Sequence, residues 1–529
     1  MSQKLFTQVA MKRPTQSTFN LTHDVKMSGK MGLLMPMCAI DVLPGDNFKI
    51  GADALVRLAP ILAPIMHRVD FTIHYFFVPN RLLWDNWEKF ISGTPDENGD
   101  AYVQPYVTLE YGPIPGDILK LADYLGISTP DTTSTSTEDV LAFPFLAYNL
   151  IYNDYYRDQN LIQPLDWDVT DGNNTIKMLA CYGNGALQKR AYEHDYFTSC
   201  LPFAQKGAAV DIPLGNVVLS DDLTGKQPFF TDVTKTAFLT GTVKQPSAGI
   251  GNEIINTDST DVAYLNPNGS LQVGSTTIND LRRAYRLQEW LEKNARGGTR
   301  YTEQILVHFD VKSPDARLQR PEYITGIKSP IIVSEVLNTN GPTEFFNGES
   351  GNVEQTGSPQ GDMAGHGVGV HSGRVGRYYA QEHGWIIGIM SVMPKTAYQQ
   401  GINKMFTRRD YLDYAFPTFA NLGEQEVLKR EVMAYRDESS ELFGYIPRYA
   451  EYKFMNSRVA GDFRTTLDYW HLGRIFDTVP NLSQDFIEAD PEDVKRIFAV
   501  QDDTDNLWMH ILNKISVKRK LPFFGTPTI

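Results

Sequence analysis

The strongest constraint on the fold of this chain is the alternation of apolar side chains in two of its segments. In residues 69–78, VDFTIHYFFV, every second side chain is apolar, and residues 303–311, EQILVHFDV, repeat the pattern. A period of two with β-branched and aromatic residues is typical of half-buried strands. The apolar run WIIGIMSVM at 385–393 has the length of a buried strand. We therefore predict a β-rich domain.

Helical insertions are predicted between these strands. Residues 79–93 open with Pro79 and end with Gly93, which suit the first position and the C-terminal cap of a helix. Residues 277–298 carry an apolar stripe at helical spacing and end in two glycines. A third helix is expected after Pro144, and Pro164 limits its length.

The third helix contains a run of tyrosines and charges, NLIYNDYYRDQNL at 149–161. Phe145, Tyr148, Tyr152 and Tyr155 recur at three- and four-residue spacing, so they share one helix face. The period alone favours an amphipathic helix packed on a core. Because each tyrosine hydroxyl needs a polar partner, a half-hydrated face that contacts another subunit is the second interpretation.

The charge of the chain is unevenly distributed. The 529 residues have a net charge of −14, yet the first thirty and the last twenty residues are each basic, at +4. An acidic surface repels nucleic acid on average, so contact with DNA would need local basic patches or a basic partner. The three cysteines are too few for a disulfide framework, the N-terminus lacks a signal-peptide pattern, and no apolar run reaches the length of a membrane span. We expect synthesis in a cytoplasm and no membrane insertion.

Two segments have the composition of elaborated loops. Residues 211–280 combine acids with much Gly, Ser, Thr and Asn, which suits an insertion that faces solvent. Residues 341–373 are richer still in glycine, and we expect them to form a mobile loop.

A search for catalytic signatures yields no candidate catalytic residue. The nucleophile elbow, the phosphate-binding lysine loop, the dinucleotide glycine fingerprint and the paired-cysteine motif are absent, and no spacing selects a carboxylate pair for glycoside hydrolysis. His366, His371 and His383 cluster in the sequence, but their spacing matches no zinc template, and we favour a glycine-rich loop with incidental histidines. No metal and no cofactor are predicted.

Basic residues are concentrated on the helix predicted at 277–298. Arg282, Arg283 and Arg286 would cover part of one side, where they could meet phosphates. The favoured alternative is a solvated helix face that pairs with nearby acids.

Eight motifs taken together resemble one protein family. In order along the chain they are IDVLPGDNF (40–48), FFVPNRLLWDNWEKFISG (76–93), YNDYYRDQNL (152–161), DYFTSCLPFAQKG (195–207), ARLQRPEYITG (316–326), QEHGWIIGI (381–389), YQQGINKMF (398–406) and FANLGEQEV (419–427). The set resembles the major capsid proteins of the Microviridae, the small single-stranded DNA phages, and is most similar to the gokushovirus-like members. The resemblance covers nearly the whole chain and thins at 211–277 and 341–373.

The resemblance implies a mainly β fold, a single eight-stranded antiparallel jelly roll whose strands are joined by long loop and helical insertions. It implies three parts: residues 1–210 with the N-terminal arm and the first strands, residues 211–277 as a variable surface insertion that forms a threefold protrusion, and residues 278–529 with the remaining strands and a basic tail. It further implies pentamers, a T=1 icosahedral shell around circular single-stranded DNA, assembly in the bacterial cytoplasm, and attachment to a host surface receptor through the insertion.

The expected partners are other copies of the chain, the circular genome, a small basic DNA-binding protein and a minor capsid or pilot protein. The expected site residues fall into two sets. The predicted subunit-interface residues are Trp84, Trp87, Tyr152, Tyr155 and Arg157; the predicted contacts to DNA or to a basic partner are Lys12, Arg13, Arg282, Arg283, Arg286, Lys518, Arg519 and Lys520. The alternatives are another phage structural protein, such as a spike or tail component, and a β-rich carbohydrate-active protein.

Overall fold

The computed structural model describes residues 16–208, 210, 278–296, 306–308, 318–337 and 363–524, except positions 97, 135, 167, 183–185, 374 and 503, together with six short strands inside 217–356. The chain divides into two compact units, Met1–Ala204 with Lys312–Ile529, and Gln205–Val311. Each unit is described by itself. The first unit contains the large sheet and the insertions that cover it.

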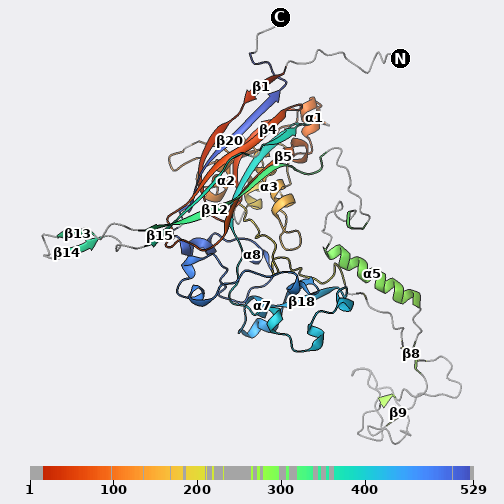
Figure 1. The fold of residues 1–529 in the computed structure, drawn as a ribbon. Helices are drawn as coiled ribbons and strands as arrows, with labels where there is room; N and C mark the ends of the chain where they lie inside the picture. The colour runs from red at the N-terminus through yellow and green to blue at the C-terminus, as the bar shows by residue number, and fades with distance from the viewer. Residues whose placement is uncertain are drawn as a thin grey trace, which may run out of the picture. The chain divides into compact units, whose positions relative to one another are not determined.

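The first unit is built on one antiparallel sheet that curls on itself (Figure 1). Eight strands form a continuous path in the order β1-β20-β4-β15-β12-β5-β17-β3, and β2 and β16 pair beside it. Their bounds are β1 Ser17–Asn20, β2 His23–Gly29, β3 Met35–Val42, β4 Asn47–Leu58, β5 Val69–Pro79, β12 Glu322–Leu337, β15 Met363–His371, β16 Gly376–Tyr379, β17 Gly384–Pro394 and β20 Leu507–Arg519. The prediction of a mainly β, jelly-roll-like fold with helical insertions is confirmed.

Strand β12 joins the two halves of this sheet. Its first part, up to Ile331, pairs with β5, and its last part, from Ile332, pairs with β15. A strand that changes partner in this way turns the sheet around its own inner face. The enclosed core is apolar, with Phe48, Phe71 and Ile511 fully buried among its members.

Strand β5 corrects one prediction about burial. The alternation predicted a half-buried strand, whereas nearly every residue of β5 is buried. The inner side chains join the core, and the opposite face, with Phe76 and Val78, is covered by the insertions that carry α1 (Trp87–Ser92), α2 (Gly116–Tyr124) and α3 (Phe143–Ile151). The second face is therefore apolar at its end, at Phe76 and Val78, where the insertions exclude water from it, and polar at its start, at Asp70 and Thr72.

The helix expected at 79–93 is shorter than predicted. Pro79 is the last residue of β5, and a 3-10 turn at Asn80–Leu82 precedes α1. The predicted C-cap is confirmed, because Gly93 adopts φ 69° and its N–H bonds back to the last turn of α1.

Strand β15 contradicts the prediction of a loop for the last part of 341–373. Met363–His371 pairs with both β12 and β4. A Cβ on Gly367 would lie 2.5 Å from Leu58 Cδ1, and one on Gly369 would lie 2.8 Å from Phe71 Cε1. The glycines therefore occupy the crowded inner face of a strand, where larger side chains would not fit.

The strand predicted at 303–311 is wrong where the structure describes it. Leu306, Val307 and His308 form one helical turn, and the rest of this segment lies outside the described residues. The helix predicted at 277–298 is confirmed as α5, Ile278–Arg296, in the second unit. That unit also contains two strand pairs, β8 (Val217–Leu219) with β11 (Leu271–Val273) and β9 (Phe230–Thr231) with β10 (Tyr264–Leu265).

The chain between β17 and β20 forms an irregular insertion. Its apolar core includes Val432 and Phe486 and is shared with an earlier segment of the chain that contains Phe197. Its regular elements are β18 Glu424–Leu428, α7 Lys429–Val432, β19 Leu442–Pro447 and α8 Gln484–Ile487, joined by 3-10 turns. The other regular elements of the first unit are β6 Tyr106–Leu109, β7 Glu138–Leu141, α4 Thr175–Cys181, β13 Thr343–Phe346 and β14 Val353–Thr356.

Candidate functional site

The tyrosine run connects distant parts of the same subunit. Helix α3 continues into a π-helical turn at Tyr152–Tyr156. The Tyr148 hydroxyl donates to the Leu34 carbonyl at 2.9 Å, and Tyr152 donates to Glu488 Oε1 at 3.0 Å. Tyr155 donates to the Pro321 carbonyl at 2.7 Å, and Tyr156 bonds to His74 Nδ1 at 2.7 Å. A π turn re-aims successive side chains, so each hydroxyl reaches a different segment.

The predicted interface residues are largely internal. Trp84, Trp87 and Tyr152 are buried inside the subunit, which argues against their direct contact with a neighbour. Arg157 donates to the carbonyl of Ile162 in its own chain at 2.7 Å. Tyr155 is the most exposed aromatic residue of the set, at 39%. The helix-packing interpretation of this run was therefore the better one.

The predicted nucleic-acid residues fall into three groups, at the N-terminus, on α5 and at the C-terminus. Lys12 and Arg13 lie outside the described residues. Arg282 and Arg283 are exposed on α5, and Arg286 forms an ion pair with Glu289 at 2.6 Å.

The C-terminal basic residues lie at and just after the end of β20. Lys518 and Lys520 are exposed. Arg519 pairs with the buried Asp46 at 2.7 Å and donates to the Asp41 carbonyl, so it anchors the end of β20.

The three clustered histidines are also separated. His366 and His371 are five residues apart on β15, so they point to opposite faces of the strand. His383 packs edge-on against Trp87 just before β17.

A surface that no sequence pattern indicates lies in the insertion between β17 and β20. We call it the aromatic surface and define it by its exposed large apolar side chains: Phe406, Tyr411, Tyr414, Phe416, Leu422, Tyr435, Tyr452, Phe454 and Met455. Arg408 stacks over the rings of Tyr414 and Tyr452, which brings these two tyrosines together. Exposed aromatic residues interleaved with arginine are typical of a protein interface.

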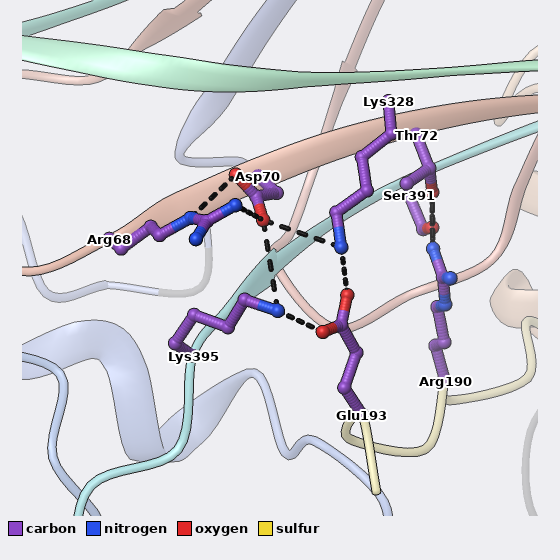
Figure 2. A network of polar contacts seen from close by, with 8 residues as sticks. All are labelled: Arg68, Asp70, Thr72, Arg190, Glu193, Lys328, Ser391 and Lys395. Atoms are coloured by element: carbon purple, nitrogen blue, oxygen red, sulfur yellow. Dashed lines mark hydrogen bonds and ion pairs between the residues drawn. The ribbon is translucent and has the colours of Figure 1, made fainter. Parts of the chain in front are cut away.

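A second cluster, the polar cluster, lies where β12, β5 and β17 run side by side (Figure 2). The register places Lys328 and Ser391 on either side of Thr72. Arg190 donates to the hydroxyls of Thr72 and Ser391.

The carboxylate of Asp70, two residues along β5, is surrounded by cations. Its oxygens lie 3.4 Å from Arg68, 3.5 Å from Lys328 and 3.9 Å from Lys395. The two lysines also pair with Glu193 (Figure 2).

Burial has an electrostatic cost in this cluster. It lowers the pKa of the Arg190 guanidinium and that of the Lys395 ammonium, because both cations lose hydration. Asp70 is 3% exposed, and its Oδ2 atom has no hydrogen bond among the described residues although three cations surround it. The Oδ2 atom of Asp70 is therefore held by Coulomb attraction, whereas Arg190 and Glu193 form directed hydrogen bonds.

A cavity of about 590 Å³ adjoins the polar cluster. Arg68, Lys395 and Arg458 line it with Glu193 and Asp195, and Met455 and Phe463 form part of its apolar wall. His67, also in the wall, bonds through Nε2 to the Lys395 carbonyl at 2.6 Å, and burial lowers the pKa of its imidazole. A neutral His67 donates this bond, so the positive charge comes from the arginines and lysines.

Comparison with known proteins connects this fold to one family. The family model described as capsid protein (F protein) matches residues 7–529. The chain belongs to this capsid-protein family. Its relatives include the capsid protein VP1 of Bdellovibrio phage phiMH2K, which is 35% identical over 99% of this chain and 98% of the relative. The VP1 proteins of Chlamydia phage 1 and Spiroplasma virus 4 are 32% and 30% identical, over 99% and 97% of this chain and 97% and 95% of their own lengths.

This membership confirms the resemblance to gokushovirus-like capsid proteins of the Microviridae. The family is structural and not an enzyme family, which excludes the carbohydrate-active alternative. A capsid protein is a component of the virion. Among the described residues, none of the helices is both long and apolar enough to cross a membrane.

Proposed function

We propose that this capsid protein assembles through pentamers into a T=1 icosahedral shell that encloses circular single-stranded DNA. The aromatic surface is the observation that carries the proposal. A chain with ample internal cores nevertheless exposes Phe406, Tyr411 and Tyr435 at 70% or more. Such rings are costly to hydrate, and copies of the chain that cover them would gain binding free energy.

The five residues predicted to form the subunit interface are assigned two different roles in assembly. Tyr155 is 39% exposed, and we assign it a contact with a neighbouring copy. Trp84, Trp87, Tyr152 and Arg157 would support assembly indirectly, because they hold α1 and α3 in place under the surface.

The variable insertion at 211–277 is proposed to form a protrusion that attaches to a host receptor. Its composition is acidic and poor in apolar residues, and it lies within the separate unit Gln205–Val311. Deletion of 211–277 should leave shell formation intact and abolish adsorption to the host. Loss of folding in this deletion would contradict the assignment.

Genome packaging is proposed to need both basic segments of this chain and a small basic partner. The net charge of −14 opposes DNA binding, whereas Lys12, Arg13, Lys518 and Lys520 lie in basic ends. Arg282, Arg283 and Arg286 offer a further exposed patch on α5. We also propose a minor capsid or pilot protein as a partner, and assembly in the bacterial cytoplasm.

Expression of the chain in a bacterial host, followed by negative-stain microscopy, tests the central proposal. Closed particles of uniform size support it, and small oligomers without closed particles would contradict it. Nuclease protection of a circular DNA, measured with and without the small basic protein, tests packaging. DNA-filled particles that contain this chain alone would show that the partner is unnecessary.

A further inference from the structure

The polar cluster carries more positive charge than its own carboxylates balance. It and the adjoining cavity are lined by five cationic side chains, Arg68, Arg190, Lys328, Lys395 and Arg458, and by three carboxylates, Asp70, Glu193 and Asp195. These charges differ in burial: the side chain of Arg68 is 67% exposed, whereas Asp70 is 3% exposed and Arg190 is partly buried. An excess of positive charge beside the buried groups is costly away from water, so an anion there would be stabilising.

Arg190 is the clearest sign of this excess. Its guanidinium donates to two neutral hydroxyls, those of Thr72 and Ser391, and it lies over the ring of Tyr156. None of the carboxylates in the described part of the chain forms an ion pair with it. Arg190 lines a small cavity that shares Glu193, Lys395 and Thr396 with the cavity of about 590 Å³. An anion could therefore approach the cluster from the larger cavity.

Asp195 does not correct the imbalance. Its Oδ1 atom accepts from the N–H groups of Phe197 and Thr198 at 2.9 and 2.8 Å, and its Oδ2 atom accepts from the Tyr398 hydroxyl at 2.7 Å. This carboxylate is used to cap a turn. At the outer wall, Arg458 is exposed and has no ion-pair partner within the described ranges.

Two other cavities of similar size provide an internal comparison. A cavity of about 470 Å³ is lined by Lys26 and Lys120 together with Asp123 and Asp505, so its charges balance. Another of about 590 Å³ is lined by Lys189 with Asp485 and Glu488, so it is acidic. The excess of positive over negative side chains at the polar cluster is therefore not shared by these two other cavities of the acidic chain.

We propose that the cavity beside the polar cluster binds a phosphate group, carried by a free nucleotide or by a nucleic-acid backbone. The terminal phosphate of a nucleotide, with about two negative charges, would balance the excess. A backbone phosphodiester, with one negative charge, would reduce it, and lysine and arginine are the usual partners of both. A volume of about 590 Å³ lies within the range of small-molecule sites. The wall of Met455 and Phe463 offers apolar contact to the nucleoside. This proposal does not depend on shell assembly.

Isothermal titration calorimetry on the full chain tests the site, with inorganic phosphate, dTMP and an octamer of deoxythymidine as probes. Sodium chloride holds the ionic strength constant. The variants are Arg458→Gln, which removes an exposed cation of the cavity wall, and Lys395→Gln. The matched controls are Arg57→Gln, an exposed arginine on β4, and Lys120→Gln in the balanced cavity.

We expect dTMP to bind the parent and the controls equally, and each site variant to weaken the affinity by about tenfold, as for loss of one charge-assisted contact. An octamer that binds more tightly than dTMP and is weakened by the same variants identifies a backbone site. Binding of dTMP without the octamer identifies a free-nucleotide site. Failure of the parent to bind any probe, or unchanged affinity in Arg458→Gln, would overturn the proposal. If Lys395→Gln does not fold, Arg458→Gln alone decides the outcome.

Discussion

At the scale of single residues, the tyrosine hydroxyls connect distant segments through hydrogen bonds, which their spacing only partly indicates. Tyr152 is 1% exposed, and its hydroxyl donates to the buried carboxyl group of Glu488. Helical spacing correctly predicted one packed face. It could not reveal that each hydroxyl bonds to a segment far along the chain, because those partners are brought near only by the fold.

The first prediction concerns Tyr152. Tyr152→Ala should lower the stability of the subunit by about 3–5 kcal/mol, because it leaves a cavity where a large ring was buried. Tyr152→Phe keeps the ring and should cost about 1–3 kcal/mol, because Glu488 loses its buried donor. Thermal unfolding of the soluble subunit measures both. The control is Tyr155→Phe at a half-exposed site, and an equal loss in all three variants would contradict this account.

The second prediction concerns the pH dependence of stability. Glu431 is 5% exposed, and burial raises the pKa of its carboxyl group above the ordinary value of 4.5. The folded state therefore binds more protons than the unfolded state above pH 4.5, so the contribution of this group to stability falls as pH rises through its folded pKa. Glu431→Gln removes that titration.

The structure makes the Glu431→Gln replacement feasible. The amide oxygen can accept from the Leu428 N–H, as Oε1 does at 3.2 Å, and the amide nitrogen can donate to the Tyr196 hydroxyl, which now lies 3.0 Å from Oε2. The measured quantity is the melting temperature of the variant minus that of the parent. We expect this difference to be larger at pH 7.5 than at pH 4.5. A relative melting temperature that stays constant or falls over this range would refute the assignment.

At the scale of elements, the apolar strands were predictable and the glycine-rich one was not. Residues 385–393 are confirmed as a strand because their run of apolar side chains is buried on both faces. Met363–His371 was mistaken for a loop because glycine disfavours strands in general. Here the alternate glycines leave room for Leu58 and Phe71, a tertiary requirement that no local pattern shows.

The third prediction tests this explanation of β15. Gly367→Ala should destabilise the subunit by about 1–3 kcal/mol, because the new methyl group would lie 2.5 Å from Leu58 Cδ1 in a packed core. Gly116→Ala is the matched control, since nothing lies within 4 Å of its Cβ position at the start of α2. The control should be neutral or slightly stabilising. Equal melting temperatures for the two variants would mean that β15 tolerates side chains on its inner face.

At the scale of the whole molecule, the family and the β-rich architecture could be predicted from the sequence. The residues that form the exposed aromatic surface could not. Trp84 and Trp87 are of a residue type that is enriched at interfaces, yet the helices of their own subunit cover them. The residues of the aromatic surface are spread over some fifty positions without a helical or strand period. Only the fold shows which rings remain uncovered.

The last prediction separates folding from assembly by comparing two tyrosines with the same positive φ. Tyr435 and Tyr449 both have φ 61°, the left-handed region that asparagine tolerates better than most residues. Tyr435 is 88% exposed on the aromatic surface, whereas Tyr449 is 7% exposed. Tyr435→Asn should therefore keep the melting temperature of the subunit and reduce the yield of particles, because it removes an exposed ring that a neighbouring copy would bury in the shell. Tyr449→Asn should instead lower the melting temperature, since it replaces a buried ring. Particle yield is measured by sedimentation and negative-stain microscopy, and particles of Tyr435→Asn at the parental yield would show that the aromatic surface does not hold the shell together at this position.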